Sequence, residues 1–485
     1  MKNIKETVTK KDLPEKVLQI GEGNFLRAFA DWMINTMNNA GVFNGSVVIS
    51  QPIARGMSEM LNAQDCVYTV LMRGIEDGKV VEKAEVITSV SRCINPYEDF
   101  NTLLDVARNP EIKVIISNTT EAGIAYHEGD KPTDMPPQSY PAKMTVMLHE
   151  RYLALGAGSD SSILILPVEL IERNGDNLKK IVLQYATEWG FEPEFIDWLK
   201  TEVCFANTLV DRIVSGFPRD EINEICEKLG YEDNMLVTCE PFHSWVIEAP
   251  KKWAEVIPFD KVGLHVIWTD DMTPYRTRKV RILNGAHTVS VLAAYLSGYN
   301  IVREMLEDKT FNRYLKSVLN NEIIPNIKLP REELDSFAAA VLERFSNPFI
   351  KHKLLDISLN SVSKFKARCL DSLLEYTESR KELPDILCFG FAALMEFYKG
   401  EMRDGRYYGK RNGEEYEIRD NADVLAFFND AWKQGGVVKK VLSNTAFWGR
   451  NLLEVPGLEE KIEGYLSKIE KNGMRNAVEE LIEAI

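Results

Sequence analysis

The stretch VLQIGEGNFLRAF, residues 17–29, decides the fold of this 485-residue chain. It begins with the apolar run of a buried strand, turns through Gly21 and Gly23, and continues into a helix. Glycines at this spacing let a backbone turn tightly and approach a pyrophosphate at the start of a helix. Leu26 replaces the third glycine of the GxGxxG pattern, so the motif taken alone also fits an ordinary strand–helix turn.

Outside this stretch, the first half of the chain alternates apolar runs with helical patterns. The runs are rich in Val and Ile and several are continuously apolar, as in parallel strands that are buried on both faces. We predict strands at 16–21, 45–50, 68–74, 113–120 and 161–170, separated by helices such as 24–40 and 97–109. Alternation of strands and helices favours a doubly wound sheet.

The strand signal fades from about residue 280, and amphipathic helices of 12 to 19 residues follow. We therefore predict an α/β protein with an N-terminal Rossmann-type doubly wound sheet and a mainly α-helical C-terminal domain. The expected domains are 1–270, which binds the nucleotide, and 271–485, which carries the substrate and catalytic groups.

Composition narrows the choice of partners. The formal charge of −15 disfavours nucleic acid and anionic membrane, because both require a basic surface. The seven cysteines are odd in number and form no CxxC pair, and the histidines show no metal-ligand spacing, so we expect reduced thiols and no metal. The first residues lack the apolar core of a signal peptide, which predicts a cytoplasmic protein.

Polar residues follow the fourth predicted strand in SNTTEAGI, residues 117–124. Because open α/β sheets bind ligands at the carboxyl ends of their strands, we expect Ser117, Asn118 and Thr119 to contact a cofactor and Glu121 to cap the turn. The alternative is that these residues form an ordinary capping turn.

The end of the second strand, VVISQPIARG, lacks the acidic residue that usually holds the adenine ribose. Arg55 would suit a 2′-phosphate if it faced the nucleotide, but it is equally an ordinary surface arginine. The choice between NAD and NADP stays open on this chemistry.

The decapeptide KVRILNGAHT, residues 279–288, gathers three groups suited to proton transfer or substrate binding at the predicted domain join, where ligand clefts usually open. In an α-helix, Asn284 and His287 lie about 60° apart, while Lys279 lies about 140° from Asn284 and belongs to the flank. A desolvated lysine exchanges protons near neutrality, and an asparagine stabilises a developing oxyanion. The alternative is a capped helix with a surface lysine and a core histidine.

These motifs together resemble the mannitol dehydrogenase family of polyol-specific long-chain dehydrogenases. The family pattern Lys-x4-Asn-x2-His matches the decapeptide, and GxGxFxRA matches residues 21–28. The segments at 207–213, 240–248 and 344–350 also resemble family segments in the expected order. The resemblance implies Lys279 as general acid/base, Asn284 as carbonyl polariser and His287 as substrate positioner. It further implies cofactor contacts from Gly21, Gly23, Asn24 and Phe25, and substrate contacts from Val210 and Asp211.

Within the family, residues 117–124, 166–175 and 271–288 most resemble the members that act on ketouronates. This resemblance implies NADH-dependent, reversible and metal-independent reduction of D-tagaturonate to D-altronate in hexuronate catabolism. The alternatives are reduction of the epimeric fructuronate, a mannitol-type polyol dehydrogenase, and a catalytically silent NAD-binding sensor.

Two features bear on the substrate. Leu170 stands where polyol members carry a second asparagine, so either Asn284 serves alone or Asn174 or Asn207 assists it. A uronate also needs a cation for its carboxylate, and residues 360–372 offer Lys364, Lys366 and Arg368 within five positions. We predict Lys364 as the ligand with Arg368 beside it, although helical cations are commonly solvated.

Overall fold

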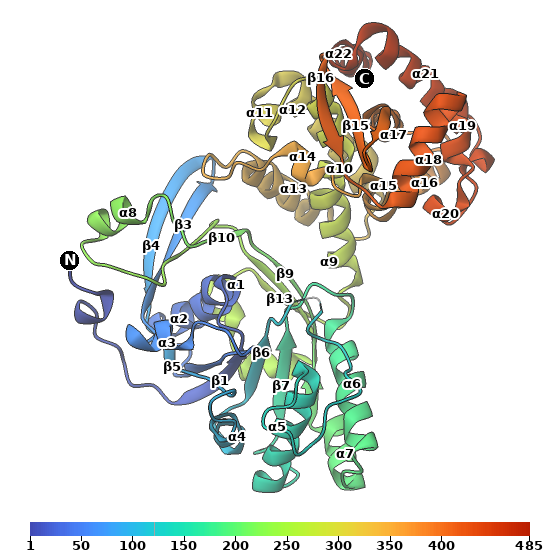
Figure 1. Cartoon of the computed structure of the whole chain (residues 1–485). Coiled ribbons are helices and arrows are strands. Elements are labelled where there is room, and N and C mark those ends of the chain that lie inside the picture. The colour runs from blue at the N-terminus through green and yellow to red at the C-terminus, as the bar shows by residue number, and fades with distance from the viewer. Residues whose placement is uncertain (121) are drawn as a thin grey trace. The chain divides into compact units, whose positions relative to one another are not determined.

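The computed structural model describes residues 1–120 and 122–485; Glu121, the predicted turn cap, lies outside the described residues. The chain divides into two units, Met1–Met272 and Thr273–Ile485 (Figure 1). Each unit is described by itself below.

Six parallel strands form the main sheet of the N-terminal unit, in the order β5-β2-β1-β6-β7-β8. The strand order reverses between β1 and β6, which makes their carboxyl ends the topological switch point of the sheet. The bounds are β1 Glu15–Ile20, β2 Ser46–Ser50, β5 Val90–Ile94, β6 Val114–Ser117, β7 Ile163–Pro167 and β8 Val203–Phe205. The predicted doubly wound sheet is confirmed.

Both faces of this sheet are buried, which explains its continuous apolar strands. Val17 and Ile116 belong to a core cluster on one face, which includes the helical run α1 (Asn24–Leu26), η2 (Arg27–Asp31) and α2 (Trp32–Asn39). Leu18 and Ile115 belong to the cluster on the opposite face, where α4, α5 and α6 lie side by side (Figure 1). The remaining helices of the unit are η1 Ile4–Glu6, α3 Ser58–Ala63, α4 Asn101–Arg108, α5 Tyr140–Leu155, α6 Asn174–Glu188, α7 Pro193–Thr201, α8 Ile222–Leu229, η3 Lys251–Glu255 and η4 Phe259–Val262.

The predicted strand at 68–74 is a strand but does not belong to the parallel sheet. It forms β3 (Tyr68–Glu76), which pairs antiparallel with β4 (Lys79–Ile87) through a two-residue turn at Asp77 and Gly78. Both turn residues have positive φ, the geometry that Asp-Gly favours in tight hairpins. The strand that follows β2 in the parallel sheet is instead β5. This strand is short and contains a charged residue, and the sequence analysis did not predict it.

Short strands complete the N-terminal unit. The sheet of β3 and β4 also contains β10 (Val214–Gly216) and β11 (Val237–Cys239), and a further sheet contains β9 (Asn207–Asp211), β12 (Ser244–Glu248) and β13 (Val266–Thr269). These strands pack against the same core cluster as the helical run that follows the glycine turn.

The C-terminal unit is mainly helical, as predicted, and is organised around α10 (Gly285–Leu296) and α17 (Asp385–Phe397). The two helices approach closely because residue 390 is glycine: a Cβ there would lie 2.5 Å from Val289. The other helices are α9 Thr273–Arg278, η5 Lys279–Asn284, α11 Val302–Glu307, α12 Lys309–Ser317, η6 Val318–Ile323, η7 Ile324–Asn326, α13 Arg331–Phe345, α14 Leu354–Ile357, α15 Ser361–Phe365, η8 Lys366–Leu370, α16 Asp371–Arg380, α18 Ala422–Gln434, α19 Val437–Leu442, α20 Thr445–Trp448, η9 Leu452–Glu454, α21 Leu458–Asn472 and α22 Met474–Ala484.

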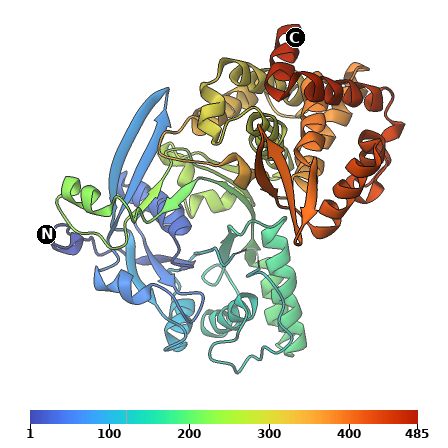
Figure 2. The ribbon, with the colours of Figure 1, turned by 45° about the horizontal axis from the view of Figure 1, so that its top comes forward.

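A small antiparallel sheet that the sequence reading missed also belongs to this unit (Figure 2). Its strands are β14 (Gly400–Arg403), β15 (Arg406–Arg411) and β16 (Glu414–Ile418). Among the described residues, no helix has the length and apolar character needed to cross a bilayer.

Candidate active site

The glycine turn lies at the switch point of the parallel sheet. The Gly21 amide donates to the Ser50 carbonyl at the end of β2, and the Asn118 amide beyond β6 donates to the Ile20 carbonyl. Gly21 has φ +126°, and a Cβ there would lie 3.0 Å from the Asn118 carbonyl oxygen, so a side chain is excluded. A Cβ at Gly23 would meet no atom within 4 Å, which leaves open space at the start of the helical run.

The Arg27 side chain holds the glycine turn through hydrogen bonds from the protein interior. Its buried guanidinium donates to the Glu22 carbonyl (3.0 Å), to Asn24 Oδ1 (2.8 Å) and to the Met235 carbonyl. Phe25 stacks on Phe29 with ring centroids 5.0 Å apart. The arginine of the GxGxFxRA motif therefore holds the shape of the turn from inside the protein.

The segment after β6 is organised by Glu169, which the sequence reading did not single out. Glu169 Oε1 accepts hydrogen bonds from the Thr119 amide and hydroxyl, both at 2.9 Å, and Oε2 accepts one from Ser117 Oγ at 3.2 Å. Burial raises the pKa of the Glu169 carboxyl, and the hydrogen bonds from Thr119 and Ser117 oppose that shift. The Ser117 and Thr119 hydroxyls are therefore already hydrogen-bonded to Glu169 within the protein.

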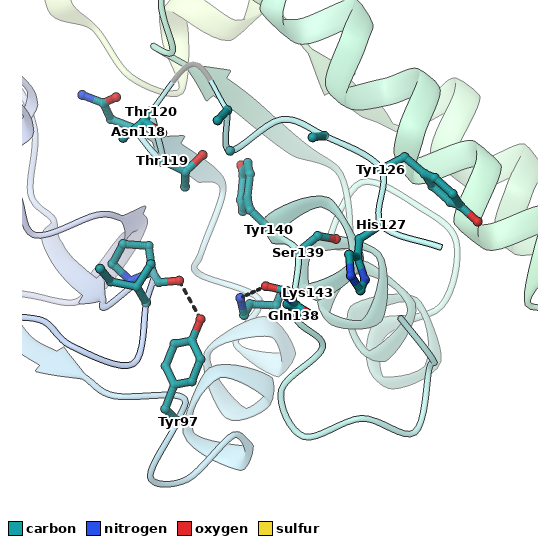
Figure 3. Close-up of a pocket in the computed structure, with 15 residues that line it drawn as sticks. Tyr97, Asn118, Thr119, Thr120, Tyr126, His127, Gln138, Ser139, Tyr140 and Lys143 are labelled. Atoms are coloured by element: carbon teal, nitrogen blue, oxygen red, sulfur yellow. Dashed lines mark hydrogen bonds between the residues drawn. The ribbon is translucent and has the colours of Figure 1, made fainter. Parts of the chain in front are cut away.

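Asn118, Thr119 and Thr120 line a cavity of about 410 Å³ in the N-terminal unit (Figure 3). Pro52 and Ile53 beyond β2 form another part of its wall. The volume lies within the range of small-molecule sites. Its position, beside the carboxyl ends of β2 and β6, is where open α/β sheets bind ligands.

Tyr97 and Lys143 line the same cavity, and sequence reasoning missed both. The Tyr97 hydroxyl donates to the Pro52 carbonyl at 2.8 Å, and Lys143 Nζ donates to the Gln138 carbonyl at 2.9 Å (Figure 3). The ammonium lies 5.1 Å from the centre of the Tyr97 ring. Burial lowers the pKa of Lys143 to about 8. Tyr97 lies far along the chain from Gln138 and Lys143, which hides the grouping from a linear reading.

In the C-terminal unit, Lys279–Asn284 forms a π-helical turn between α9 and α10. This corrects the α-helical geometry assumed from the sequence. A π turn closes i→i+5 hydrogen bonds and holds one more residue per turn. Lys279 and Asn284 are five residues apart, so the wider turn brings them closer to one face than the 140° of an α-helix. Single π turns frequently occur at functional sites.

The π turn packs directly against the segment that carries the predicted carboxylate ligands. A Cβ at Gly285 would lie 3.1 Å from the Arg368 carbonyl oxygen, so glycine permits this close approach. Arg368 Nη1 donates to Thr288 Oγ1 at 3.3 Å. Arg368 itself belongs to a second π turn, η8. The structure thus brings residues about 80 positions apart to one place.

His287 lies one helical turn beyond Asn284 with its ring stacked on Phe345, 3.8 Å between ring centres. The ring of His352 meets it edge-on at 5.4 Å. Burial lowers the pKa of His287 well below its ordinary value, and the charges of His352, Arg344, Arg368 and Lys364 add to this shift. The imidazole is therefore neutral, and its buried Nε2 has no hydrogen-bond partner among residues 1–120 and 122–485.

The cations near His287 form a basic group in an acidic chain. Lys364 and Arg368 are half-buried, and burial lowers the pKa of each. Lys364 Nζ donates to the Ile357 carbonyl at 2.8 Å, which occupies one of its three N–H bonds. Sequence reasoning missed Arg344 and His352, which arrive from other elements.

Two asparagines named as alternative donors are already occupied within the N-terminal unit. The Asn174 amide donates to the carbonyls of Pro167, Glu169 and Thr208, and its oxygen accepts from the Thr208 amide. Asn207 links the Asp176 amide to Glu248. Leu170 is 64% exposed just beyond β7.

Val210 and Asp211 end β9, and they differ in burial. Val210 is 3% exposed and belongs to the core cluster of the N-terminal unit, while Asp211 is half-buried. Because side chains alternate along a strand, the two residues point to opposite faces. Asp211 is the better placed of the two to meet a ligand.

A doubly wound sheet with a glycine turn at its switch point, followed by a helical domain, is the architecture of dinucleotide-dependent dehydrogenases. Residues 15–261 match the family model of the mannitol dehydrogenase Rossmann domain, and residues 271–470 match that of the mannitol dehydrogenase C-terminal domain. This chain belongs to the mannitol dehydrogenase family and is an oxidoreductase that acts on CH–OH groups.

Its relatives include the altronate oxidoreductases of Phocaeicola vulgatus, 43% identical over 99% of both chains, and of Escherichia coli, 44% identical over 96% of this chain and 97% of that one. Among solved structures, a substrate-free D-sorbitol dehydrogenase has 22% identity and a TM-score of 0.81 over 96% of this chain and 95% of that one. Pseudomonas fluorescens mannitol 2-dehydrogenase, solved with NAD and D-mannitol, has 23% identity and a TM-score of 0.68 over 98% and 96%. These two structures support the fold.

Proposed function

We propose that this chain reduces D-tagaturonate to D-altronate reversibly, with NADH as the reductant, in hexuronate catabolism. Identity of 43–44% to curated altronate oxidoreductases across almost the whole chain carries the proposal. The half-buried cations near His287 support it, because a protein with a net charge of −15 must gather basic residues to hold a carboxylate. The substrate is a small ketouronate or aldonate, with no role for nucleic acid or membrane, and the proposed location is the cytoplasm.

NAD fits the turn at the switch point, and when bound it supplies or accepts a hydride. The φ of Gly21, its close contact with the Asn118 carbonyl and the open space at Gly23 all suit close approach of a pyrophosphate. The cavity of about 410 Å³ beside the turn suits the adenine half. Residues 1–270 would hold the cofactor through Gly21, Gly23, Asn24, Phe25, Ser117, Asn118 and Thr119.

Residues 271–485 would carry the proton chemistry. In reduction, the Lys279 ammonium gives its proton to the oxygen of the former ketone; in oxidation, the amine takes the proton from the alcohol. The Asn284 amide donates to the same oxygen and stabilises the negative charge that develops there. Because Asn174 and Asn207 are occupied by internal hydrogen bonds, Asn284 performs this task alone.

The remaining groups orient the substrate. The free Nε2 of neutral His287 binds a substrate hydroxyl. Arg368 offers a planar pair of N–H donors to the carboxylate, and Lys364 adds a second positive charge. Of the two predicted β9 residues, Asp211 would contact the substrate, because Val210 lies in the core cluster.

The proposal is tested by measuring oxidation of NADH by the purified protein with D-tagaturonate, D-fructuronate and D-fructose in parallel, and again with NADPH. We expect the highest kcat/KM with D-tagaturonate and NADH. Preference for D-fructuronate would replace the substrate and keep the mechanism. Turnover of D-fructose alone would overturn the assignment of the carboxylate ligands, and no turnover with any ketone would contradict the proposal.

A further inference from the structure

The end of β2 carries no acid that could hold the adenine ribose, since residues 51–56 read QPIARG. Gln51 does not replace it. Its amide nitrogen donates to the Ile53 carbonyl at 2.8 Å, and its oxygen accepts from the Ser58 amide at 3.2 Å. The Gln51 side chain therefore shapes its own loop, and the ribose partner must come from elsewhere.

Glu22, between the two glycines of the turn, reaches this loop with its carboxylate. Its Oε1 accepts a hydrogen bond from the Met57 amide at 3.2 Å, and a Cβ at Gly56 would lie 2.3 Å from the same oxygen. Glu22 is 5% exposed. Its Oε2 is buried and has no hydrogen-bond partner within the described part of the chain.

A buried carboxylate oxygen that accepts no hydrogen bond destabilises the folded protein. Its presence therefore indicates that a ligand supplies the missing donor. Burial raises the pKa of Glu22, and the Met57 amide and Arg27 oppose that shift. A ligand that brings a hydroxyl to Oε2 would remove the cost.

The position of Glu22 indicates which ligand this is. Gly21, the preceding residue, packs on the Asn118 carbonyl, and Asn118 lines the cavity of Figure 3. The loop that Glu22 contacts supplies Pro52 and Ile53 to the same cavity. The carboxylate thus lies between the glycine turn and the loop at the carboxyl end of β2, where the ribose of a dinucleotide is held.

We propose that Glu22 binds the adenosine ribose hydroxyls of the dinucleotide and rejects a 2′-phosphate at that position. The assignment rests on the proposed dinucleotide cofactor. A carboxylate accepts hydrogen bonds from vicinal hydroxyls, whereas a 2′-phosphate would bring about 1.5 to 2 negative charges against it. The acid thereby comes from the glycine turn instead of the end of β2.

The test compares binding of 5′-ADP and 2′,5′-ADP to the full-length protein by calorimetry, without turnover. Wild type should bind 5′-ADP more tightly. Glu22→Gln keeps an acceptor for Met57 but removes the charge, and it should weaken 5′-ADP about tenfold and reduce the discrimination against 2′,5′-ADP. In turnover, its KM for NADH should rise while kcat changes little.

Glu59→Gln is the matched control, because Glu59 is an exposed acid in the first turn of α3, close along the chain. It should leave both affinities unchanged. Glu22→Asp, which retains the charge but shortens its reach, should lose affinity for 5′-ADP and still reject 2′,5′-ADP.

Unchanged discrimination in Glu22→Gln, or an equal loss for both nucleotides, would overturn the assignment. Failure of wild type to bind either nucleotide would overturn it as well. Wild type that discriminates between the nucleotides but reduces no ketouronate would contradict the proposed substrate and leave Glu22 in place.

Discussion

In the proposed mechanism, Lys279 and Asn284 would have different tasks at the substrate oxygen, because their side chains have different chemistry. The ammonium can lose a proton, whereas the amide can only donate a hydrogen bond. The structure leaves a single asparagine for this second task, since Asn174 and Asn207 serve internal hydrogen bonds. These internal hydrogen bonds favour the alternative in which Asn284 acts alone.

Replacing Lys279 by alanine should remove the proton donor and lower kcat by about 10²- to 10⁴-fold, the usual contribution of general acid–base catalysis. The affinity for NADH and the thermal stability should stay near wild type, because Lys279 is only half-buried. Steady-state kinetics and thermal unfolding check both. Lys316→Ala, at an exposed lysine of α12, should behave as wild type. Equal kcat in the Lys279 and Lys316 variants would remove Lys279 from the mechanism.

Replacing Arg368 by glutamine should raise the KM for D-tagaturonate about 10- to 100-fold, which corresponds to loss of a charged hydrogen bond of about 1.5–3 kcal/mol. The kcat should change little. Lys366→Gln, at an exposed cation of the same π turn, is the control and should have no effect. If the two variants gave the same KM, the carboxylate would be bound elsewhere.

His287 should make the protein lose stability as the pH falls. Its folded pKa lies well below 6.5, so the unfolded chain binds the proton more readily. The contribution of His287 is complete above pH 6.5 and decreases on acidification, by up to about 1.4 kcal/mol per pH unit. Denaturant unfolding of wild type and His287→Gln between pH 5 and 8 measures it. The free-energy advantage of wild type should shrink toward pH 5; a constant difference would show that His287 keeps an ordinary pKa.

At the level of elements, three of the four π turns in the described part of the chain fall on predicted functional segments: η2 after the glycine turn, η5 at Lys279 and η8 at Arg368. A linear reading finds these segments by residue type but assigns them α-helical angles. Hydrogen-bond registers of i→i+5 have no simple signature in single residues, so the angular error at Lys279 was unavoidable.

The contact between the η5 turn and η8 should depend on Gly285. Gly285→Ala places a Cβ 3.1 Å from the Arg368 carbonyl oxygen, so we expect a loss of about 1–3 kcal/mol in stability and a lower kcat. Gly464→Ala in α21 has open space and should instead stabilise by about 0.5–1 kcal/mol. Thermal unfolding of both variants decides the matter. A Gly285→Ala protein as stable and active as wild type would refute the packing argument.

The assignment of strands shows where sequence patterns stop. All five predicted runs are strands, because alternate residues of β1, β6 and β7 fill both faces of the sheet. The run at 68–74 was placed in the wrong sheet because pairing depends on the following Asp77-Gly78 turn, which sends the chain into a hairpin. Hairpin signals of this kind carry more information on pairing than apolar content does.

For the whole molecule, the order of elements and the change from strands to helices could be predicted, because the spacing of apolar residues along the chain indicates both. The cavity lined by Tyr97 and Lys143 and the group formed by His287, His352 and Arg344 could not, because each joins residues from distant segments. The basic group stands out because the chain has a net charge of −15. We expect half-buried cations in such an acidic chain to bind an anionic ligand.

A competition experiment tests whether the chain is a reductase of D-tagaturonate. The purified protein receives equal concentrations of D-tagaturonate and D-fructuronate with limiting NADH, and the products are separated and quantified. Their ratio reports the ratio of the two kcat/KM values. The account predicts that D-altronate dominates. A product mixture dominated by D-mannonate, or NADH left unoxidised, would contradict it.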